Sequence, residues 1–144
     1  MTKCYLDSNF LAYWKNRGVP QYKETQRIVE QLQQNETLLY VSPLVIDEYI
    51  HAMMGEARVN KHYNPYEVAE KSLNDLLALP LLTIVPTPWD IPSQTQMLTF
   101  MKTYSLRPRD AYHLLTMQAN DIDGFATFDT DFARVFAAKL LTKA

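Results

Sequence analysis

Short apolar runs alternate with longer amphipathic segments along this chain. The apolar runs predict strands at 4–6, 38–41, 81–85 and 125–127, with a weaker edge strand at 139–142. Apolar positions at helical spacing and capping residues predict helices that begin near Phe10 and cover 21–34, 42–53, 67–79, 94–104, 109–120 and 131–138. Strands separated by helices pair in parallel through right-handed crossovers. We therefore expect an α/β fold with three layers, α/β/α, around a central parallel sheet.

Length and composition narrow the class of protein. The chain has 144 residues with 47% hydrophobic residues, which fits one globular domain over 1–144. Fourteen Lys and Arg against sixteen Asp and Glu give a net charge of −2, which excludes a basic protein that coats nucleic acid and a disordered chain. Cys4 is the only cysteine, so we expect no disulfide and no cysteine zinc site. The longest apolar stretch, 76–85, is interrupted by Pro80 and is too short to span a membrane, so we expect a cytoplasmic protein.

The positions of five acidic residues point to chemistry. Asp7 follows the first predicted strand, and Asp129 and Asp131 follow the strand at 125–127. Asp110 falls in the first turn of a predicted helix and Glu48 in the second turn of another. Ligands of open parallel sheets bind beyond the carboxyl ends of the strands, where these acids are expected to converge.

Each acid also has an ordinary structural explanation. Asp7 can cap the helix that follows it, Asp110 can favour the positive end of a helix dipole, and Asp129 can be a turn or cap residue. Glu48 is harder to explain in this way, because it lies beyond capping reach on an apolar stripe and a carboxylate there needs a partner.

Electrostatics favours a joint explanation of the acids. Two unit charges about 4 Å apart repel by roughly 4 kcal/mol at an effective dielectric constant near 20. Several carboxylates in one pocket therefore stay ionised only with a cation among them. Ligand sets made only of oxygen select hard cations such as Mg²⁺ or Mn²⁺. Such ions activate a water and neutralise the charge that builds up on a phosphodiester.

Four short motifs contain these acids: YLDSN at 5–9, SPLVIDE at 42–48, LRPRDAYHL at 106–114 and TFDTDF at 127–132. Together and in this order they resemble the PIN-domain family of metal-dependent ribonucleases, most of all its VapC-like toxins. The resemblance covers the whole chain and implies a sheet of about five parallel strands with an acidic pocket that holds one or two Mg²⁺ or Mn²⁺ ions.

The resemblance also assigns roles to individual residues. It implies a catalytic quartet of Asp7, Glu48, Asp110 and Asp129, and a metal-ligand set of Asp7, Asp110, Asp129 and Asp131. Glu48 is expected to be either a ligand or the residue that orients a metal-bound water. Supporting roles fall to Ser8, Asn9, Thr127 and His113. His113 can touch the substrate or be a core histidine with a buried partner, and the sequence leaves both open.

The function expected from the resemblance is an endoribonuclease that hydrolyses RNA, the toxin of a type II toxin–antitoxin pair. The expected partners are an RNA substrate, a cognate antitoxin and a second copy of the chain, bound through helices such as 67–79 and 94–104. Candidates for steering the RNA backbone are Arg58, Lys61, Lys102, Arg107 and Arg109. The basic and aromatic segment 57–66 can bind unpaired bases, or can be a solvated loop or a surface for a partner.

Several alternatives stay open at this point. A PIN-fold module that binds RNA or metal without cleavage, or an RNA-processing nuclease without an antitoxin, fits the same motifs. Phosphatases of the haloacid-dehalogenase type fit less well, because they need a second Asp where this chain has Asn9. Response-regulator receivers also fit less well, because they need a late Lys where this chain has Thr127 and Asp129.

Overall fold

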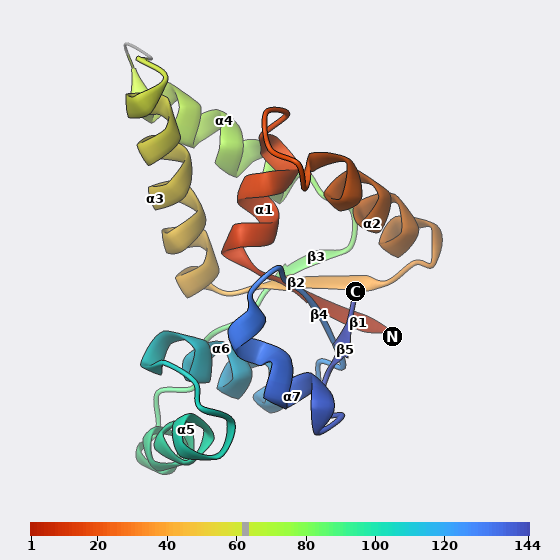
Figure 1. Ribbon diagram of the computed structural model, residues 1–144, viewed down its shortest axis with the longest axis vertical. Coiled ribbons are helices and arrows are strands. Elements are labelled where there is room, and N and C mark those ends of the chain that lie inside the picture. Colours follow the sequence, from red (N-terminus) through yellow and green to blue (C-terminus); the bar gives the residue numbers. More distant parts are fainter. Residues whose placement is uncertain (62–63) are drawn as a thin grey trace.

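A parallel sheet forms the centre of the computed structural model, which describes residues 1–61 and 64–144 (Figure 1). In these residues the sheet has five strands in the order β3-β2-β1-β4-β5, and every neighbouring pair is parallel. The strands are β1 (Lys3–Leu6), β2 (Leu38–Val41), β3 (Leu82–Ile84), β4 (Gly124–Ala126) and β5 (Thr142–Lys143). The predicted parallel α/β/α architecture is therefore confirmed.

The central strand β1 is almost completely buried. Cys4, Tyr5 and Leu6 are completely buried, and β1 pairs with β2 on one side and β4 on the other. Gly124 faces Cys4 across the β1–β4 pair, and a Cβ at this position would lie 2.8 Å from the carbonyl oxygen of Lys3. The close approach of the two backbones thus requires glycine at 124.

Helices cover both faces of the sheet (Figure 1). On one face lie α1 (Ser8–Lys15), α2 (Tyr22–Gln34) and the long pair α3 (Pro43–Val59) and α4 (Pro65–Leu77). On the other lie α5 (Ile91–Tyr104), α6 (Pro108–Ala119) and α7 (Ala133–Ala137), the last preceded by the short 3₁₀ helix η1 (Thr130–Phe132).

The helix starts follow from side chains that accept hydrogen bonds from free backbone N–H groups. Asp7 caps α1, Ser42 caps α3, and Asp90 caps α5. Proline occupies the first turn of α3 and of α6, where its missing N–H costs no hydrogen bond. Asp7 and Ser42 directly follow strands, so the same residues that end β1 and β2 also begin the helices beside the site.

The predicted end of the helix at 42–53 is wrong. Helix α3 continues to Val59, because Ala57 in the additional part is buried and α3 packs along α4. The predicted segment 57–66 therefore begins inside a helix and ends inside α4, which starts at Pro65. Residues 62 and 63 of that segment lie outside the described residues.

The C-terminal region also differs from the prediction. The expected helix over 131–138 is divided into η1 and the short α7. The expected strand over 139–142 is displaced to β5, because Lys139 adopts a left-handed backbone conformation with φ 58° and closes α7 instead of extending.

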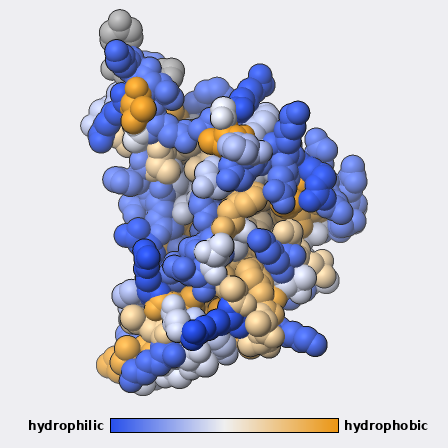
Figure 2. All heavy atoms as spheres, in the orientation of Figure 1, coloured by the Kyte–Doolittle hydropathy of each residue, from blue (hydrophilic) through white to orange (hydrophobic). Residues whose placement is uncertain are grey.

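Surface hydrophobicity is unevenly distributed. Figure 2 shows hydrophobic side chains gathered toward the end of the molecule where Figure 1 places α5 and α7, whereas the end with the α3–α4 tip is mostly hydrophilic. Helix α5 contains no buried residue, and Trp89 and Ile91 at its start are 90% and 84% exposed. Among the described residues, no helix combines the length and the apolar character needed to cross a membrane.

Candidate active site and metal centre

The five acids singled out in the sequence lie at the carboxyl end of the sheet. Asp7 follows β1 directly, and Asp129 and Asp131 follow β4. Glu48 lies in the second turn of α3, and Asp110 lies in the first turn of α6. The local folding rules for strand ends and helix starts therefore bring together residues that are distant in the sequence.

Asp7 is 6% exposed and is held by two hydrogen bonds. The Thr127 hydroxyl donates to Asp7 Oδ2 at 2.5 Å, and the Ser8 backbone N–H donates to Asp7 Oδ1 at 2.8 Å. Burial raises the pKa of Asp7, although both hydrogen bonds act in the opposite direction. The ionised form of this carboxylate therefore gains from a nearby cation.

Glu48 contacts two side chains of α6. Arg109 Nε lies 3.1 Å from Glu48 Oε1, and His113 Nε2 lies 3.0 Å from Glu48 Oε2. Burial raises the pKa of Glu48, but the contacts with His113 and Arg109 outweigh it and hold that pKa below its ordinary value. Glu48 is thus an ionised carboxylate near neutral pH.

A second group consists of Asp110, Asp129 and Asp131. One carboxylate oxygen from each lies within 4.8 Å of the others. Burial, followed by the charges of Asp129 and Asp131, raises the pKa of Asp110. The one salt bridge of this group in the described residues is from Arg107 Nε to Asp131 at 3.8 Å, and Arg107 is 83% exposed. Three carboxylates with so little compensating charge fit a divalent cation.

The predicted acidic quartet is divided between two groups. Asp7 and Glu48 lie with His113, whereas Asp110 and Asp129 lie with Asp131. Thr127 connects the groups, because its hydroxyl donates to Asp7 and its Oγ1 accepts a hydrogen bond from the backbone N–H of Asp129 at 3.0 Å. The structure thus places the acids in two adjacent sets with one hydroxyl between them.

Comparison with known proteins identifies the family of this chain. A family model described as PIN domain matches residues 4–137. The chain belongs to the PIN domain family.

Individual relatives agree with this assignment. The PIN domain is 28% identical over 137 residues to Ribonuclease VapC2 of Methanocaldococcus jannaschii, a match that covers 92% of this chain and 89% of the relative. Its fold is similar to that of VapC20 from Mycobacterium tuberculosis, a toxin that cleaves the sarcin–ricin loop, with a TM-score of 0.67, 17% identity and coverage of 92% and 94% of the two chains. It is also similar to the structure of VapBC2 from Rickettsia felis bound to a promoter DNA fragment, with a TM-score of 0.65, 17% identity and coverage of 99% and 97%.

The supporting residues of the PIN domain have specific positions. His113 is 3% exposed and bonded to Tyr5 and Glu48, which places it among buried partners and away from the surface. Asn9 accepts a hydrogen bond from the backbone N–H of Phe128 at 3.2 Å, so it holds the segment after β4 and not the Asp7 carboxylate. Ser8 lines a cavity of about 290 Å³ together with Glu48 and Arg109.

The basic residues divide into two sets. Arg107 and Arg109, just before and in the first turn of α6, contact site carboxylates. Arg58 lies ten residues after Glu48 on α3, about 15 Å along the helix axis, and Lys61 lies beyond it. Lys102 is exposed near the end of α5. No contact between a site acid and Arg58, Lys61 or Lys102 occurs in the described part of the chain.

Three residues around the site of the PIN domain were given no role from the sequence, namely Tyr5, Asp47 and His51. Tyr5 is a core residue of β1 whose hydroxyl bonds both Ser42 and His113. A tyrosine in a buried strand needs a partner for its hydroxyl, and that signal could have found this pair. Asp47 and His51 line the cavity beside Glu48.

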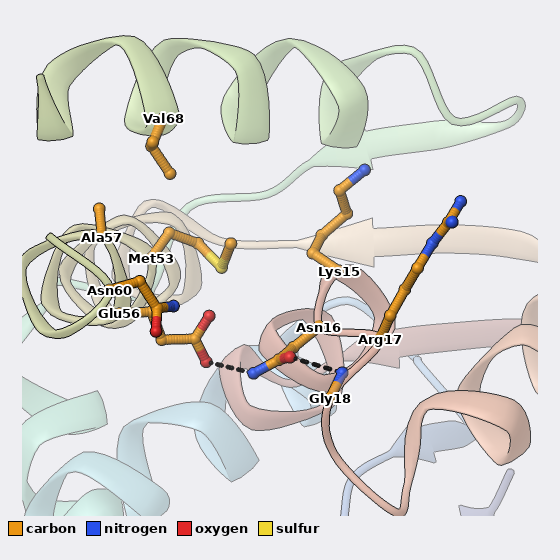
Figure 3. Close-up of a pocket in the computed structure, with 9 residues that line it drawn as sticks. All are labelled: Lys15, Asn16, Arg17, Gly18, Met53, Glu56, Ala57, Asn60 and Val68. Atoms are coloured by element: carbon orange, nitrogen blue, oxygen red, sulfur yellow. Dashed lines mark hydrogen bonds between the residues drawn. The ribbon is translucent and has the colours of Figure 1, made fainter. Parts of the chain in front are cut away.

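A larger cavity of about 350 Å³ lies elsewhere, between the end of α1 and the α3–α4 pair (Figure 3). Asn16 lines this cavity and makes two hydrogen bonds there. Its Nδ2 donates to Glu56 Oε1 at 3.0 Å, and its Oδ1 accepts from the Gly18 backbone N–H at 2.9 Å. None of the five predicted acids lines this cavity, so it is separate from the carboxylate site.

Proposed function

We propose that this PIN domain is a metal-dependent endoribonuclease that hydrolyses RNA phosphodiester bonds, and that it acts as the toxin of a type II toxin–antitoxin pair. The observation that carries the proposal is the pair of carboxylate groups joined by Thr127 at the carboxyl ends of β1 and β4. Supporting it is the similarity to a protein named Ribonuclease VapC2 over 92% of the chain.

The proposed metal ligands are Asp7, Asp110, Asp129 and Asp131. The last three have oxygens within 4.8 Å of one another, and Asp7 is joined to Asp129 through Thr127. These donors are all carboxylate oxygens, which favour Mg²⁺ or Mn²⁺. When bound, such an ion supplies Lewis-acid stabilisation of the phosphoryl oxygens and activation of a water.

The chain's own residues have the remaining tasks. Glu48 is ionised and lines the cavity of about 290 Å³. Its carboxylate is suited to accept a hydrogen bond from a water and so to orient that water. Arg107 and Arg109 are exposed guanidinium groups beside the site and are suited to bind the phosphates on either side of the scissile bond. We therefore assign catalysis to Asp7, Glu48, Asp110 and Asp129.

We also propose two protein partners and a compartment. An antitoxin is proposed because the similar folds include a chain described as a toxin and the VapBC2 structure with promoter DNA. A second copy of the chain is proposed because α5 and the residues before it expose Trp89, Ile91 and Leu98. The buried free thiol of Cys4 is compatible with the reducing cytoplasm, where cellular RNA is found.

The test is cleavage of total cellular RNA by the purified protein, with the cut ends mapped. Cleavage should require Mg²⁺ or Mn²⁺, stop with a chelator, and be abolished by Asp7→Asn. An Asp7→Asn variant that cuts as well as the parent would overturn the assignment of the site. RNA that is bound equally well with and without metal, and is never cut, would instead indicate a binding module.

A further inference from the structure

A chain of buried hydrogen bonds leads from the start of α3 to the Glu48 carboxylate. Ser42 Oγ lies 2.6 Å from Tyr5 Oη, and Tyr5 Oη lies 3.1 Å from His113 Nδ1. His113 Nε2 then lies 3.0 Å from Glu48 Oε2. Tyr5 and Ser42 are completely buried and His113 is 3% exposed, so solvent has almost no access to these groups.

The direction of donation along this series of hydrogen bonds follows from a count of the available protons. The Val45 backbone N–H donates to Ser42 Oγ at 3.3 Å. In the described residues the only other partner of Ser42 Oγ is Tyr5, so the serine proton points to Tyr5 Oη. The tyrosine proton must then point to His113 Nδ1, which leaves the ring proton on Nε2, where it donates to Glu48.

The opposite direction leaves a buried group unsatisfied. If His113 Nδ1 carried a proton, Tyr5 would accept it and donate to Ser42. The serine proton would then have no acceptor among the described residues, which costs about 1–3 kcal/mol for a buried donor.

We propose that His113, as its Nε2–H tautomer, and Tyr5 are positioning residues that fix the Glu48 carboxylate for catalysis. The ring N–H holds Glu48 Oε2, and Oε1 is left to face Arg109 and the cavity beside Ser8. Ser42 caps α3, and Glu48 lies six residues later on the same helix. The series of hydrogen bonds therefore connects the Glu48 carboxylate to the start of its own helix through Tyr5 of β1 and His113 of α6. This inference rests on the proposed function, because a fixed Glu48 matters only if Glu48 acts on the substrate.

A purely structural role predicts different behaviour. If the network only filled the core, apolar replacements of similar shape would leave catalysis unchanged in the folded fraction of the protein. A positioning role instead requires an N–H group at the place of His113 Nε2. Gln offers its side-chain NH₂ near that place, whereas the shorter Asn offers polar atoms only near Nδ1.

The first test reads the tautomer directly and needs no enzyme activity. Long-range ¹H–¹⁵N NMR of the full chain labelled in its three histidines should show the His113 ring protonated at Nε2 and unprotonated at Nδ1. The His113 signals are those missing from His113→Asn. Tyr5→Phe should shift the Nδ1 signal, because it removes the donor. A ring protonated at Nδ1 in the parent would overturn the proposal, whether or not the protein cuts RNA.

The second test separates positioning from folding. His113→Asn and Tyr5→Phe should each lower kcat about 10–100-fold with KM changed less than about 3-fold, because they alter a group that acts after binding. His113→Gln should stay within about 5-fold of the parent. Tyr49→Phe is the matched control, because the Tyr49 hydroxyl is also buried but donates to the Ser72 carbonyl at 3.2 Å.

The outcomes distinguish this inference from the proposed function. Equal kcat for His113→Gln and His113→Asn, or an equal loss for Tyr49→Phe and Tyr5→Phe, would contradict the positioning role while leaving the nuclease in place. A parent that never cuts RNA would contradict the proposed function and with it the catalytic use of Glu48. The tautomer measurement would then still test the hydrogen-bond network by itself.

Discussion

Thr127 contacts one member of each carboxylate group. Its hydroxyl donates to Asp7 Oδ2 at 2.5 Å and accepts from the Asp129 backbone N–H at 3.0 Å, and the residue is 3% exposed. A hydroxyl at this position both orients the Asp7 carboxylate and fixes the turn that carries Asp129. Groups that orient metal ligands are expected to matter almost as much as the ligands themselves.

We therefore expect Thr127→Val to lower cleavage about 10–100-fold, because valine keeps the shape of threonine and loses both hydrogen bonds. Thr127→Ser keeps the hydroxyl and should retain most of the activity. Initial rates on a defined RNA, with circular dichroism as a check on folding, measure the difference. Equal activity of the Val and Ser variants would show that the hydroxyl does not organise the site.

Asp110 lies close to two other carboxylates, those of Asp129 and Asp131. Burial and the charges of Asp129 and Asp131 raise its pKa, so ionisation of Asp110 opposes folding at pH values above that raised pKa. Asp110→Asn should therefore raise the Tm of the metal-free protein at neutral pH by about 2 °C. The gain should vanish as the pH falls through the raised pKa, because the parent then takes up a proton at the same place.

Thermal unfolding in a chelator at several pH values measures this effect, with Asp121→Asn as a control. Asp121 is exposed, lies in the turn after α6, and has φ 51°, a conformation that Asn tolerates. A Tm of Asp110→Asn that is lower than the parent's at neutral pH would mean that the three acids are not in electrostatic conflict.

Residue identity in the site could be predicted only in part from the sequence. Glu48 was assigned to the site from the sequence, and the structure places its carboxylate against His113 and Arg109, while the neighbouring Asp47 is exposed. The division of the acids into two groups could not be predicted, because it depends on side-chain rotamers and on how α3 and α6 lie across the sheet. Tyr5 was missed because the strand was treated as purely apolar.

At the scale of elements, a salt bridge fastens α1 to α4. Lys15 Nζ lies 2.6 Å from Asp75 Oδ2, and Lys71 Nζ lies 2.9 Å from the same oxygen. The hydrogen bonds from Lys15 and Lys71 lower the pKa of Asp75. Asp7 caps α1, and α4 packs on the helix that carries Glu48, so this contact connects α1 to a helix beside the site.

Asp75→Asn should lower the free energy of unfolding by about 0.5 kcal/mol at neutral pH, a small value because the pair is partly exposed to solvent. The contribution is present above the ordinary pKa of an aspartate and is lost as the pH falls through the lowered pKa of the folded state. Urea unfolding at neutral and acidic pH measures both. Glu70→Gln, an exposed acid on the same helix, is the control. A loss that persists undiminished at acidic pH would rule out the ion pair as its cause.

Element boundaries show where local sequence signals are strong and where they fail. The starts of α3 and α6 were predicted closely, because Ser42, Pro43 and Pro108 are local signals. The end of α3 was predicted six residues too early, because the burial of Ala57 and the packing of α3 along α4 are tertiary effects. Strand β5 begins later than predicted because Lys139 adopts a left-handed backbone conformation. No local sequence pattern indicated this conformation.

At the scale of the molecule, the exposed apolar surface around α5 is the main feature that the fold itself does not use. Trp89, Ile91 and Leu98 are 90%, 84% and 46% exposed, and α5 has no buried residue. Helix α5 packs on α6, and its outer side is exposed, as a surface that binds another chain would be.

We expect the protein to be a dimer in solution and the double variant Ile91→Ser, Leu98→Ser to be a monomer. Both substitutions remove apolar surface that a stable interface of about 1,600 Å² would bury. Light scattering coupled to size exclusion measures the mass. Val59→Ser is the control, because Val59 is 81% exposed at the far end of α3. A parent that is monomeric at tens of micromolar, or a double variant that remains dimeric, would contradict this interface.

The acids at the carboxyl ends of β1 and β4 are proposed to hold a divalent cation and to cut RNA. The rate of RNA cleavage as a function of Mg²⁺ or Mn²⁺ concentration, for the parent, Asp129→Asn and Asp121→Asn, tests this proposal directly. We expect a metal-dependent rate for the parent and for Asp121→Asn, and a loss of at least about 100-fold for Asp129→Asn that added metal does not restore. Cleavage by Asp129→Asn at the parent's rate, or cleavage by the parent in excess chelator, would contradict it.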